Sequence, residues 1–367
     1  MCLVLIASGC KEAYDPSLQT GVLNYLVVEG FISGNGVTSI QLSRTQQLEE
    51  KGSIKSELKA ILVIEGDNGN VYPLSENGNG FYSSAAFTLP SDRKYRLRIK
   101  TADGEEYLSE YTEIKNTPDN KIAWSREPDG VRVKVSTGDK NNMTKYYQWR
   151  YEETWEIRSF KPSEFEVHQT RPYTTVLPRN PGEIPLLLNC WGIERSPYVL
   201  IASTAGISSD FVDNFQLSFI PNGSDKLVIR YSMLLKQYAL TREAYEFFLL
   251  MKKNTEKMGG FFDPQPSMER GNIKCISSPD KPVIGYIVAA NAVEKRIFIT
   301  SAEAGGWKSS RICEEKFTVA HRDTINTYFT DHNFLITGGE LNSYYYRSTP
   351  VCVDCRLRGS STKPSFW

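Results

Sequence analysis

The chain has 367 residues, which is enough for two or three domains and more than one hydrophobic core. Its 43 basic and 43 acidic residues cancel, and no basic stripe or acidic tail stands out. This balance argues against nucleic-acid binding and against electrostatic docking to anionic lipid. Aromatic residues make up 12% of the chain, which is typical of β-strands and of the cores between β-sheets.

Residues 1–9 are predicted to be the remnant of a signal peptide. The run is apolar and ends in small residues, and it is shorter than the roughly 20 residues that span a bilayer. Residues 7–10, Ala-Ser-Gly-Cys, resemble a bacterial lipobox, in which small residues precede a cysteine that becomes lipidated. We therefore expect acylation of Cys10, and a clipped start would explain the missing basic residues. The alternative is a buried N-terminal strand with an incidental cysteine.

Residues 10–22 are expected to form a lipid-anchored tether. Lys11, Glu12 and Pro16 give this stretch the charged, extended character of a linker. A lysine with acidic residues after the acylated cysteine is similar to the signal that displays Bacteroidetes lipoproteins on the outer face of the outer membrane. No later run approaches membrane-spanning length, so we expect this lipid to be the only anchor.

Residues 23–115 predict an N-terminal β-sandwich of immunoglobulin-like or transthyretin-like type. Turn sequences over 33–36, over 66–69 and at Asp103-Gly104 separate short alternating strands, which is a strong signal for hairpins. Alternation over 95–100 places the side chains at 95, 97 and 99 inward. Residues 116–119 are predicted to be a linker.

Residues 119–367 predict a larger β-rich domain with one helix. In the strand expected over 145–157, Tyr147, Trp149 and Tyr151 share one face. The helix is expected over about 241–258, because Thr241 is a suitable N-cap, apolar residues recur at helical spacing and two glycines follow. Further strands are expected over 131–135, 226–238, 283–289 and 295–300, so the predicted fold class is mainly β.

Five cysteines remain after the N-terminal segment, all in the second region: Cys190, Cys275, Cys313, Cys352 and Cys355. In an exported chain disulfide bonds are the first expectation, with one thiol left over. Connectivity cannot be derived from spacing, although a bond from Cys313 to Cys352 or Cys355 would tie down the C-terminal tail. The alternative is metal, because Cys352 and Cys355 have the spacing of a zinc half-site. A second half-site is missing, so we expect no metal and no cofactor.

Motifs for catalysis are not found in the sequence. The three histidines, His168, His321 and His332, do not form a zinc-protease motif, and no nucleophile elbow or phosphate loop occurs. The paired carboxylates Glu105-Glu106 and Glu152-Glu153 point to opposite faces of their strands, unlike a glycosidase pair. We therefore expect a protein that is not an enzyme, although an active site assembled from distant residues stays open.

Tryptophan side chains are the remaining candidates for recognition. Trp149, Trp155 and Trp191 could stack on a sugar or fill a pocket of a partner protein. Packing in the core is the competing explanation for each of them. Trp155 and Tyr146 lie on the face opposite Trp149 or near a strand end, so we expect at least one of these two side chains to be exposed.

Several short segments, spread in order along the chain, share one pattern. They are residues 26–30 (LVVEG), 190–191 (CW), 262–266 (FDPQP), 271–275 (GNIKC), 352–359 (CVDCRLRG) and 363–367 (KPSFW). Together they resemble the DUF4249 family of Bacteroidetes outer-membrane lipoproteins, a domain of unknown function. The resemblance extends over nearly the whole mature chain and transfers no catalytic residue. It implies a lipoprotein of the outer membrane that is often encoded beside a TonB-dependent receptor.

These features predict a surface-exposed lipoprotein of the outer membrane. We expect it to be an accessory ligand-binding or scaffold component of a TonB-dependent uptake system, with the receptor β-barrel as a partner. One alternative is a surface hydrolase or a metal or thiol redox protein that uses Cys352 and Cys355 or a pair of carboxylates distant in the sequence. Another is a structural or adhesive surface protein.

Overall fold

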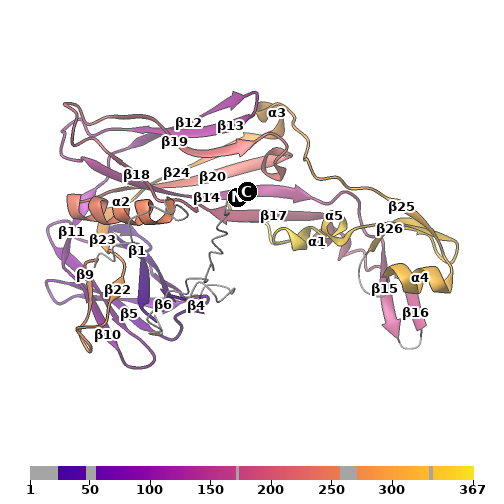
Figure 1. The fold of residues 1–367 in the computed structure, drawn as a ribbon, viewed down its shortest axis with the longest axis horizontal. Coiled ribbons are helices and arrows are strands. Elements are labelled where there is room, and N and C mark those ends of the chain that lie inside the picture. The colour runs from indigo at the N-terminus through magenta and orange to yellow at the C-terminus, as the bar shows by residue number, and fades with distance from the viewer. Residues whose placement is uncertain (1–23, 47–54, 171–172, 257–270, 330–333) are drawn as a thin grey trace, which may run out of the picture.

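The computed structural model describes residues 24–46, 55–170, 173–256, 271–329 and 334–367. Cys10, the tether, His332 and the segment 262–266 lie outside these described residues. Within them the protein is mainly β, as predicted, with five α-helices (Figure 1). None of the described helices is long and apolar enough to cross a membrane.

The first unit is a 12-stranded sheet in which eight strands close into a barrel-like ring. Their order is β11-β23-β1-β3-β7-β6-β5-β9, and β9 pairs with β11 to complete the ring. The predicted two-sheet sandwich is therefore not confirmed, because these strands belong to one closed sheet. The chain-order bounds are β1 Leu26–Ser33, β3 Ser39–Arg44, β4 Lys55–Ser56, β5 Ile61–Gly66, β6 Val71–Glu76, β7 Phe81–Ser84, β9 Lys94–Lys100, β10 Glu106–Ser109, β11 Thr112–Asn116, β21 Ile273–Cys275, β22 Val283–Ile284 and β23 Val288–Asn291; the small pair β2 Asn35–Gly36 and β8 Phe87–Thr88 lies beside them.

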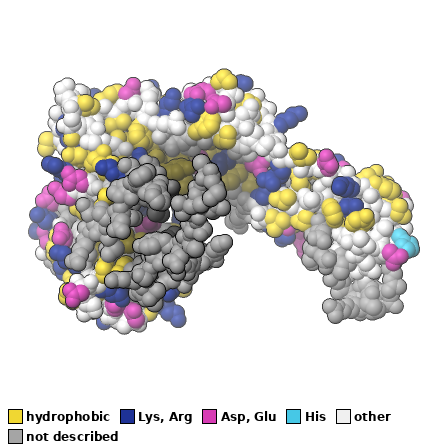
Figure 2. Space-filling view, in the orientation of Figure 1, with side chains coloured by type: hydrophobic (Ala, Val, Ile, Leu, Met, Phe, Trp, Pro, Cys, Tyr) yellow, Lys and Arg dark blue, Asp and Glu magenta, His cyan; other side chains and the backbone are white. Residues whose placement is uncertain are grey.

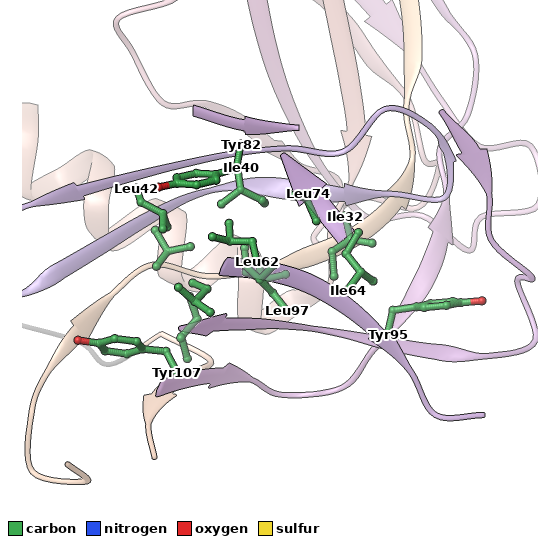
Figure 3. Packing of buried hydrophobic residues seen from close by; sticks show 14 of the residues in the cluster. Ile32, Ile40, Leu42, Leu62, Ile64, Leu74, Tyr82, Tyr95, Leu97 and Tyr107 are labelled. Atoms are coloured by element: carbon green, nitrogen blue, oxygen red, sulfur yellow. The ribbon is translucent and has the colours of Figure 1, made fainter. Parts of the chain in front are cut away.

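Glycine residues at the predicted turns explain the hairpins of this unit. Strands β5 and β6 meet across the turn at 66–69, where Gly69 adopts a φ of 84°. Strands β9 and β10 meet across Gly104, which has a φ of 88°. The predicted inward face is confirmed, because Tyr95, Leu97 and Ile99 are all buried in one core cluster. Figure 3 shows Tyr95 and Leu97 among the packed side chains of this cluster.

Strands from the far end of the sequence complete the ring. The strand predicted over 283–289 forms in two pieces, β22 and β23, and both pair in parallel with β1. The interruption falls at Gly285, whose φ of 149° favours glycine and whose Cα lies against the backbone of Val28. Residues 273–291, expected in the second domain, therefore belong to the first sheet. The domain boundaries themselves remain a prediction.

The second unit has two sheets packed face to face. Strands β12-β13-β19 form one sheet, and β17-β14-β20-β24 with β18 form the other. Their facing side chains make one buried cluster that includes Val133, Trp149 and Met233. The bounds are β12 Asn120–Glu127, β13 Gly130–Thr137, β14 Tyr146–Arg158, β17 Asn189–Arg195, β18 Leu200–Ser203, β19 Val212–Pro221, β20 Arg230–Ala239 and β24 Val293–Thr300, with α3 Ser301–Ala304 after β24.

The strand predicted over 226–238 starts later than expected. Residues Asp225–Leu227 form the 3-10 helix η1, because the Ser224 side chain accepts a hydrogen bond from the Lys226 backbone N–H and caps the turn. The strand β20 then begins at Arg230. Because of this short helix, the side chains of Asp225 and Lys226 do not alternate as they would in a strand. Both residues take part in the charged clusters described below.

Helix α2, Arg242–Glu256, joins the two units and confirms the predicted helix. Its buried face, with Ala244, Phe247 and Phe248, packs in a cluster that also holds Phe31 of β1 and Tyr238 of β20. The rings of Phe31 and Tyr238 stack with centroids 3.9 Å apart. The helix therefore lies between the barrel-like unit and the two-sheet unit, as Figure 1 shows.

A smaller lobe projects from the end of the two-sheet unit (Figure 1). It has its own core, in which Phe329, Ile336 and Tyr345 are buried. The hairpin β15–β16 and the sheet β25-β27-β26 surround this core. The bounds are β15 Phe165–Thr170, β16 Tyr173–Pro178, β25 Lys316–Val319, α4 Arg322–Phe329, β26 Leu335–Glu340 and β27 Tyr344–Ser348; α1 Ile184–Leu188, α5 Pro350–Val353 and the 3-10 helix η2 Cys355–Leu357 connect the lobe to the sheets.

Candidate functional site

Two disulfide bonds hold the C-terminal tail. Cys313 is bonded to Cys352, one of the two pairings expected from the sequence, and Cys190 is bonded to Cys355. Cys275 is a buried free thiol in β21. Cys352 and Cys355 therefore belong to different disulfides rather than to one zinc half-site or one redox pair. Among the described residues no cluster of three or more ligand side chains could hold a metal ion.

The three candidate tryptophans lie in different environments. Trp149 is fully buried, stacks on Phe215 at a centroid distance of 4.6 Å and donates from Nε1 to Gln237 at 2.7 Å. Core packing is therefore the role of Trp149 in this structure. Trp155 and Trp191 are half-buried on neighbouring strands β14 and β17, and Nε1 of Trp191 is buried without a hydrogen-bond partner among the described residues.

The histidines are not brought together. His168 lies on β15, with Nε2 2.9 Å from Oε1 of Glu166. His321 is exposed just before α4 and lies 3.5 Å from Asp323. Neither contact includes a nucleophile, so the described histidines do not build a catalytic triad.

A buried carboxylate, Glu153, links the two sheets of the second unit. Its Oε1 accepts from the Tyr231 hydroxyl at 2.7 Å and from Ser218 at 3.2 Å, and its Oε2 lies 2.5 Å from Nζ of Lys226. Burial would lower the pKa of Lys226, but hydrogen bonds from this ammonium to Glu153 and Glu194 raise it overall. The pKa of Tyr231 is raised well above its ordinary value by burial and by the adjacent carboxylate. Both oxygens of this acid are engaged, which is typical of a structural ion pair.

A hollow of about 460 Å³ lies at one end of the two-sheet unit, between the loops 138–142 and 208–211. Its buried acid, Asp210, accepts hydrogen bonds from Tyr147, Thr204 and the backbone N–H of Asp139. Burial and the hydrogen bond to Asp210 also raise the pKa of the Tyr147 hydroxyl. Asp210 thus ties two loops to the core.

The projecting lobe carries a cluster of apolar, mostly aromatic side chains at its surface that local sequence patterns did not single out. We call Phe317, Val319, Tyr344 and Tyr346 the aromatic face. Phe317 pairs with Tyr346 and Val319 with Tyr344 across β25 and β27, so all four project from the same side of the sheet. Phe317 is 59% exposed, Val319 56% and Tyr346 39%. Figure 2 shows hydrophobic side chains gathered on the surface of this lobe.

The rings of the aromatic face pack against one another. Phe317 lies 5.6 Å from Tyr344 and 6.0 Å from Tyr346, and the two tyrosine rings are 5.7 Å apart. These distances are those of favourable aromatic pairs, so the rings support one another at the surface of the lobe. Gly338, opposite Tyr346 on β26, leaves open space beside the rings.

The opposite side of the same sheet fixes the aromatic face in place. Tyr345 and Arg347 point into the lobe, where the guanidinium of Arg347 lies 3.7 Å from the ring centre of Tyr328 and donates from Nε to Thr318 at 2.7 Å. The sequence signal is the alternation in residues 316–319 and 344–347, which places successive side chains on opposite faces. The two runs are short and lie apart in the chain, so local patterning did not reveal that they pair.

The geometry defines a mainly β, multi-unit protein whose most distinctive surface is an exposed aromatic sheet face. The sequence matches the family described as domain of unknown function, DUF4249, over residues 11–296. The chain belongs to this family. A search of curated proteins gives no match.

Three of the solved structures that resemble this chain have low sequence identity to it. A structure described as manganese lipoxygenase of Gaeumannomyces graminis and part of zonadhesin of Komagataella pastoris has 10% identity, covers 60% of this chain and 90% of its own, and has a TM-score of 0.18. A DUF4785 family protein of Legionella pneumophila has 11% identity, coverages of 58% and 52%, and a TM-score of 0.18. The adhesin InvE of Yersinia pseudotuberculosis has 12% identity, coverages of 60% and 57%, and a TM-score of 0.15. Scores this low carry no conclusion about fold or function.

Proposed function

We propose that the protein is a non-enzymatic, lipid-anchored component of the bacterial outer membrane. Its role is accessory binding or scaffolding in an uptake system that contains a TonB-dependent receptor. The anchor is an acyl group on Cys10, and the body lies outside the cell surface. The two disulfide bonds support export, because such bonds persist in oxidising compartments.

The aromatic face is the observation that carries the binding role. Soluble proteins rarely leave contiguous apolar patches uncovered, and such patches rimmed by polar residues mark interaction sites. Here Lys316 and Glu340 flank the rings as exposed charged neighbours. Phe317 and Val319 supply purely apolar surface, and Tyr344 and Tyr346 add rings with a polar hydroxyl group. This composition suits a protein partner, because aromatic anchors dominate the binding energy of such interfaces.

The domain layout belongs to this proposal. Residues 23–115, with the strands from 273–291 added, form the unit that continues from the tether. Residues 119–367 supply the two-sheet unit and the lobe. The lobe projects from the end of the two-sheet unit opposite the end at which the barrel-like ring lies (Figure 1), so the lobe that carries the aromatic face is distant from β1.

The test is purification of the full chain with its leader from native membranes. We expect mass spectrometry to find acyl chains on Cys10, and a β-barrel receptor to co-purify. The double variant Phe317→Ser with Tyr346→Ser should lose the receptor while remaining folded, because both side chains are exposed. Phe211→Ser is the matched control, since Phe211 is an exposed aromatic residue at 52% on another surface.

Three results would contradict the proposal. An unmodified Cys10 in a protein that fractionates with the cytosol would remove the anchor. A membrane preparation in which no receptor co-purifies would remove the uptake role and leave the adhesive alternative. Deletion of the gene would then reduce attachment of the cells to surfaces without changing their growth on any nutrient. Equal receptor recovery with the double variant and the control would remove the aromatic face as the contact surface.

A further inference from the structure

A small pocket with an excess of arginine lies where the two-sheet unit meets the C-terminal tail. Four segments distant in sequence form it: the end of β14, the helix η1 with the residues after it, the segment 309–313 and the tail residue Arg358. Its volume is about 170 Å³, which is below the roughly 300–1,000 Å³ of sites for drug-sized ligands. A small ion, or one charged group of a larger molecule, fits this space.

Two of the arginines share one carboxylate. Arg311 donates to Oδ2 of Asp225 from Nη2 at 2.9 Å and from Nε at 3.2 Å, whereas Nη1 of Arg358 reaches the same oxygen only at 3.5 Å. The Ser309 hydroxyl occupies Oδ1 of the same carboxylate. Asp225 is therefore saturated by Arg311 and Ser309, and Arg358 is left with the weakest contact.

Arg358 is the more deeply buried of the two cations. Its side chain is 13% exposed, compared with 37% for Arg311. The buried Nε–H of Arg358 has no hydrogen-bond acceptor among the described residues. Burial, and the positive charge of Arg311, lower the pKa of Arg358. A buried N–H group without an acceptor destabilises the folded protein unless a ligand in the pocket supplies the acceptor.

A third guanidinium group adds to the excess of positive charge in the pocket. Arg158, at the end of β14, lines the same pocket and has no ion pair with any residue in the part of the chain that the structure describes. Glu156 also lines the pocket, so three guanidinium groups face two carboxylates, of which one is already saturated. The net charge of the lining is positive, and Glu156 is the one lining carboxylate that Arg311 and Ser309 do not already occupy.

We propose that this pocket binds an oxyanion, either a free phosphate or carboxylate ion or the terminal anionic group of a larger ligand. Arg358 supplies the buried Nε–H donor, Arg158 supplies a guanidinium that is free to form paired hydrogen bonds, and Arg311 adds positive charge. Planar guanidinium groups recognise the paired oxygens of such anions. The inference does not depend on the uptake role proposed above.

The experiment is isothermal titration of the full chain at low ionic strength with inorganic phosphate and, in a separate arm, with succinate. We expect saturable binding of at least one anion, and the stronger arm identifies phosphate or carboxylate as the preferred group. Arg158→Gln and Arg358→Gln should each weaken binding by roughly tenfold, the loss expected for one charge-assisted hydrogen bond. Arg242→Gln is the control, because Arg242 is an exposed arginine on α2 that pairs with Glu246 at 2.7 Å.

The proposal fails if neither anion binds, or if Arg158→Gln binds as tightly as the wild type and the control. Arg158→Gln decides the matter even if Arg358→Gln does not fold, because Arg158 is exposed and makes no ion pair with the described residues. A loss of the same size in Arg242→Gln would also overturn it, since it would show attraction by overall charge rather than by this pocket.

Discussion

Gly192 of β17 pairs with Trp155 of β14, and the indole ring covers the position where a side chain at 192 would begin. A Cβ atom built on Gly192 would meet the ring, at 2.8 Å from its Nε1. The same ring lies 5.0 Å from the ammonium of Lys226, which belongs to the buried Glu153 network. The glycine therefore allows the indole to lie flat on the neighbouring strand and to cover this network.

Gly192→Ala is expected to destabilise the protein, because the added methyl group forces Trp155 off its strand. Overpacking of this kind typically costs about 1–3 kcal/mol. Urea unfolding followed by tryptophan fluorescence measures the change in free energy. Gly206→Ala is the control, because a Cβ there meets open space, and a similar loss in both variants would show that the ring is not the cause.

Tyr231→Phe is expected to cost about 1–3 kcal/mol, because it removes a hydroxyl that donates to the buried Glu153 carboxylate. The matched control is Tyr238→Phe, in which a buried tyrosine of the same strand keeps its ring stacked on Phe31. Chemical denaturation at neutral pH gives both values. Equal effects in the two variants would mean that the hydrogen bond to Glu153 adds nothing specific.

Removing the Cys190–Cys355 bond with a pair of Cys→Ser substitutions is expected to lower stability by about 2–5 kcal/mol. This bond fixes the tail against β17, where the backbones of Trp191 and Ser360 also exchange two hydrogen bonds. Cys275→Ser is the comparison, because it changes a buried sulfur without breaking a cross-link. Thermal unfolding under oxidising conditions tests this, and a smaller loss in the double variant than in Cys275→Ser would contradict it.

Acid is expected to weaken the barrel-like unit through Glu65. Burial alone would raise the pKa of this carboxyl, but hydrogen bonds from Arg96 and Arg98 at 2.7 Å and 2.6 Å lower it overall. The folded-state pKa thus lies below the unfolded value of about 4.3. The stabilisation is therefore complete above that value and is lost as the pH falls through the folded pKa.

The measurement for Glu65 is the free energy of unfolding at several pH values between neutrality and pH 3. Glu65→Gln should show a smaller decrease toward acid than the wild type, and it should be less stable at neutral pH. Glu113→Gln is the control, because Glu113 pairs with Lys94 at 3.3 Å on the surface, with both side chains more than half exposed. Parallel curves for Glu65→Gln and the wild type would exclude Glu65 as a source of the acid sensitivity.

Local patterns in the sequence predicted the hairpins and helix α2 correctly, because neighbouring residues determine both. The turn at Gly104 and the inward side of β9 follow from residues only a few positions apart. The partners of β22 and β23 do not follow, because their pairing with β1 joins residues from opposite ends of the sequence. A prediction of a strand says nothing about which sheet it joins.

The candidate sites were harder to predict from the sequence, because they also depend on contacts between residues distant in the chain. Trp149 and Trp155 look equivalent as aromatic residues of one strand, yet the opposing sheet buries Trp149 completely and leaves Trp155 partly exposed. The arginine pocket depends on four separate segments, so spacing gives no hint that Arg158 and Arg358 meet. The pairing of Cys190 with Cys355 likewise required the tertiary arrangement.

The position of β23 between β1 and β11 has a consequence for folding. Residues 288–291 come long after β1 to β11 in the chain, so they are among the later segments to arrive when the chain is exported. Until they arrive the ring stays open, and β1 and β11 expose unpaired backbone N–H and C=O groups to other chains. A fragment that ends at residue 116 is therefore expected to aggregate rather than to fold alone.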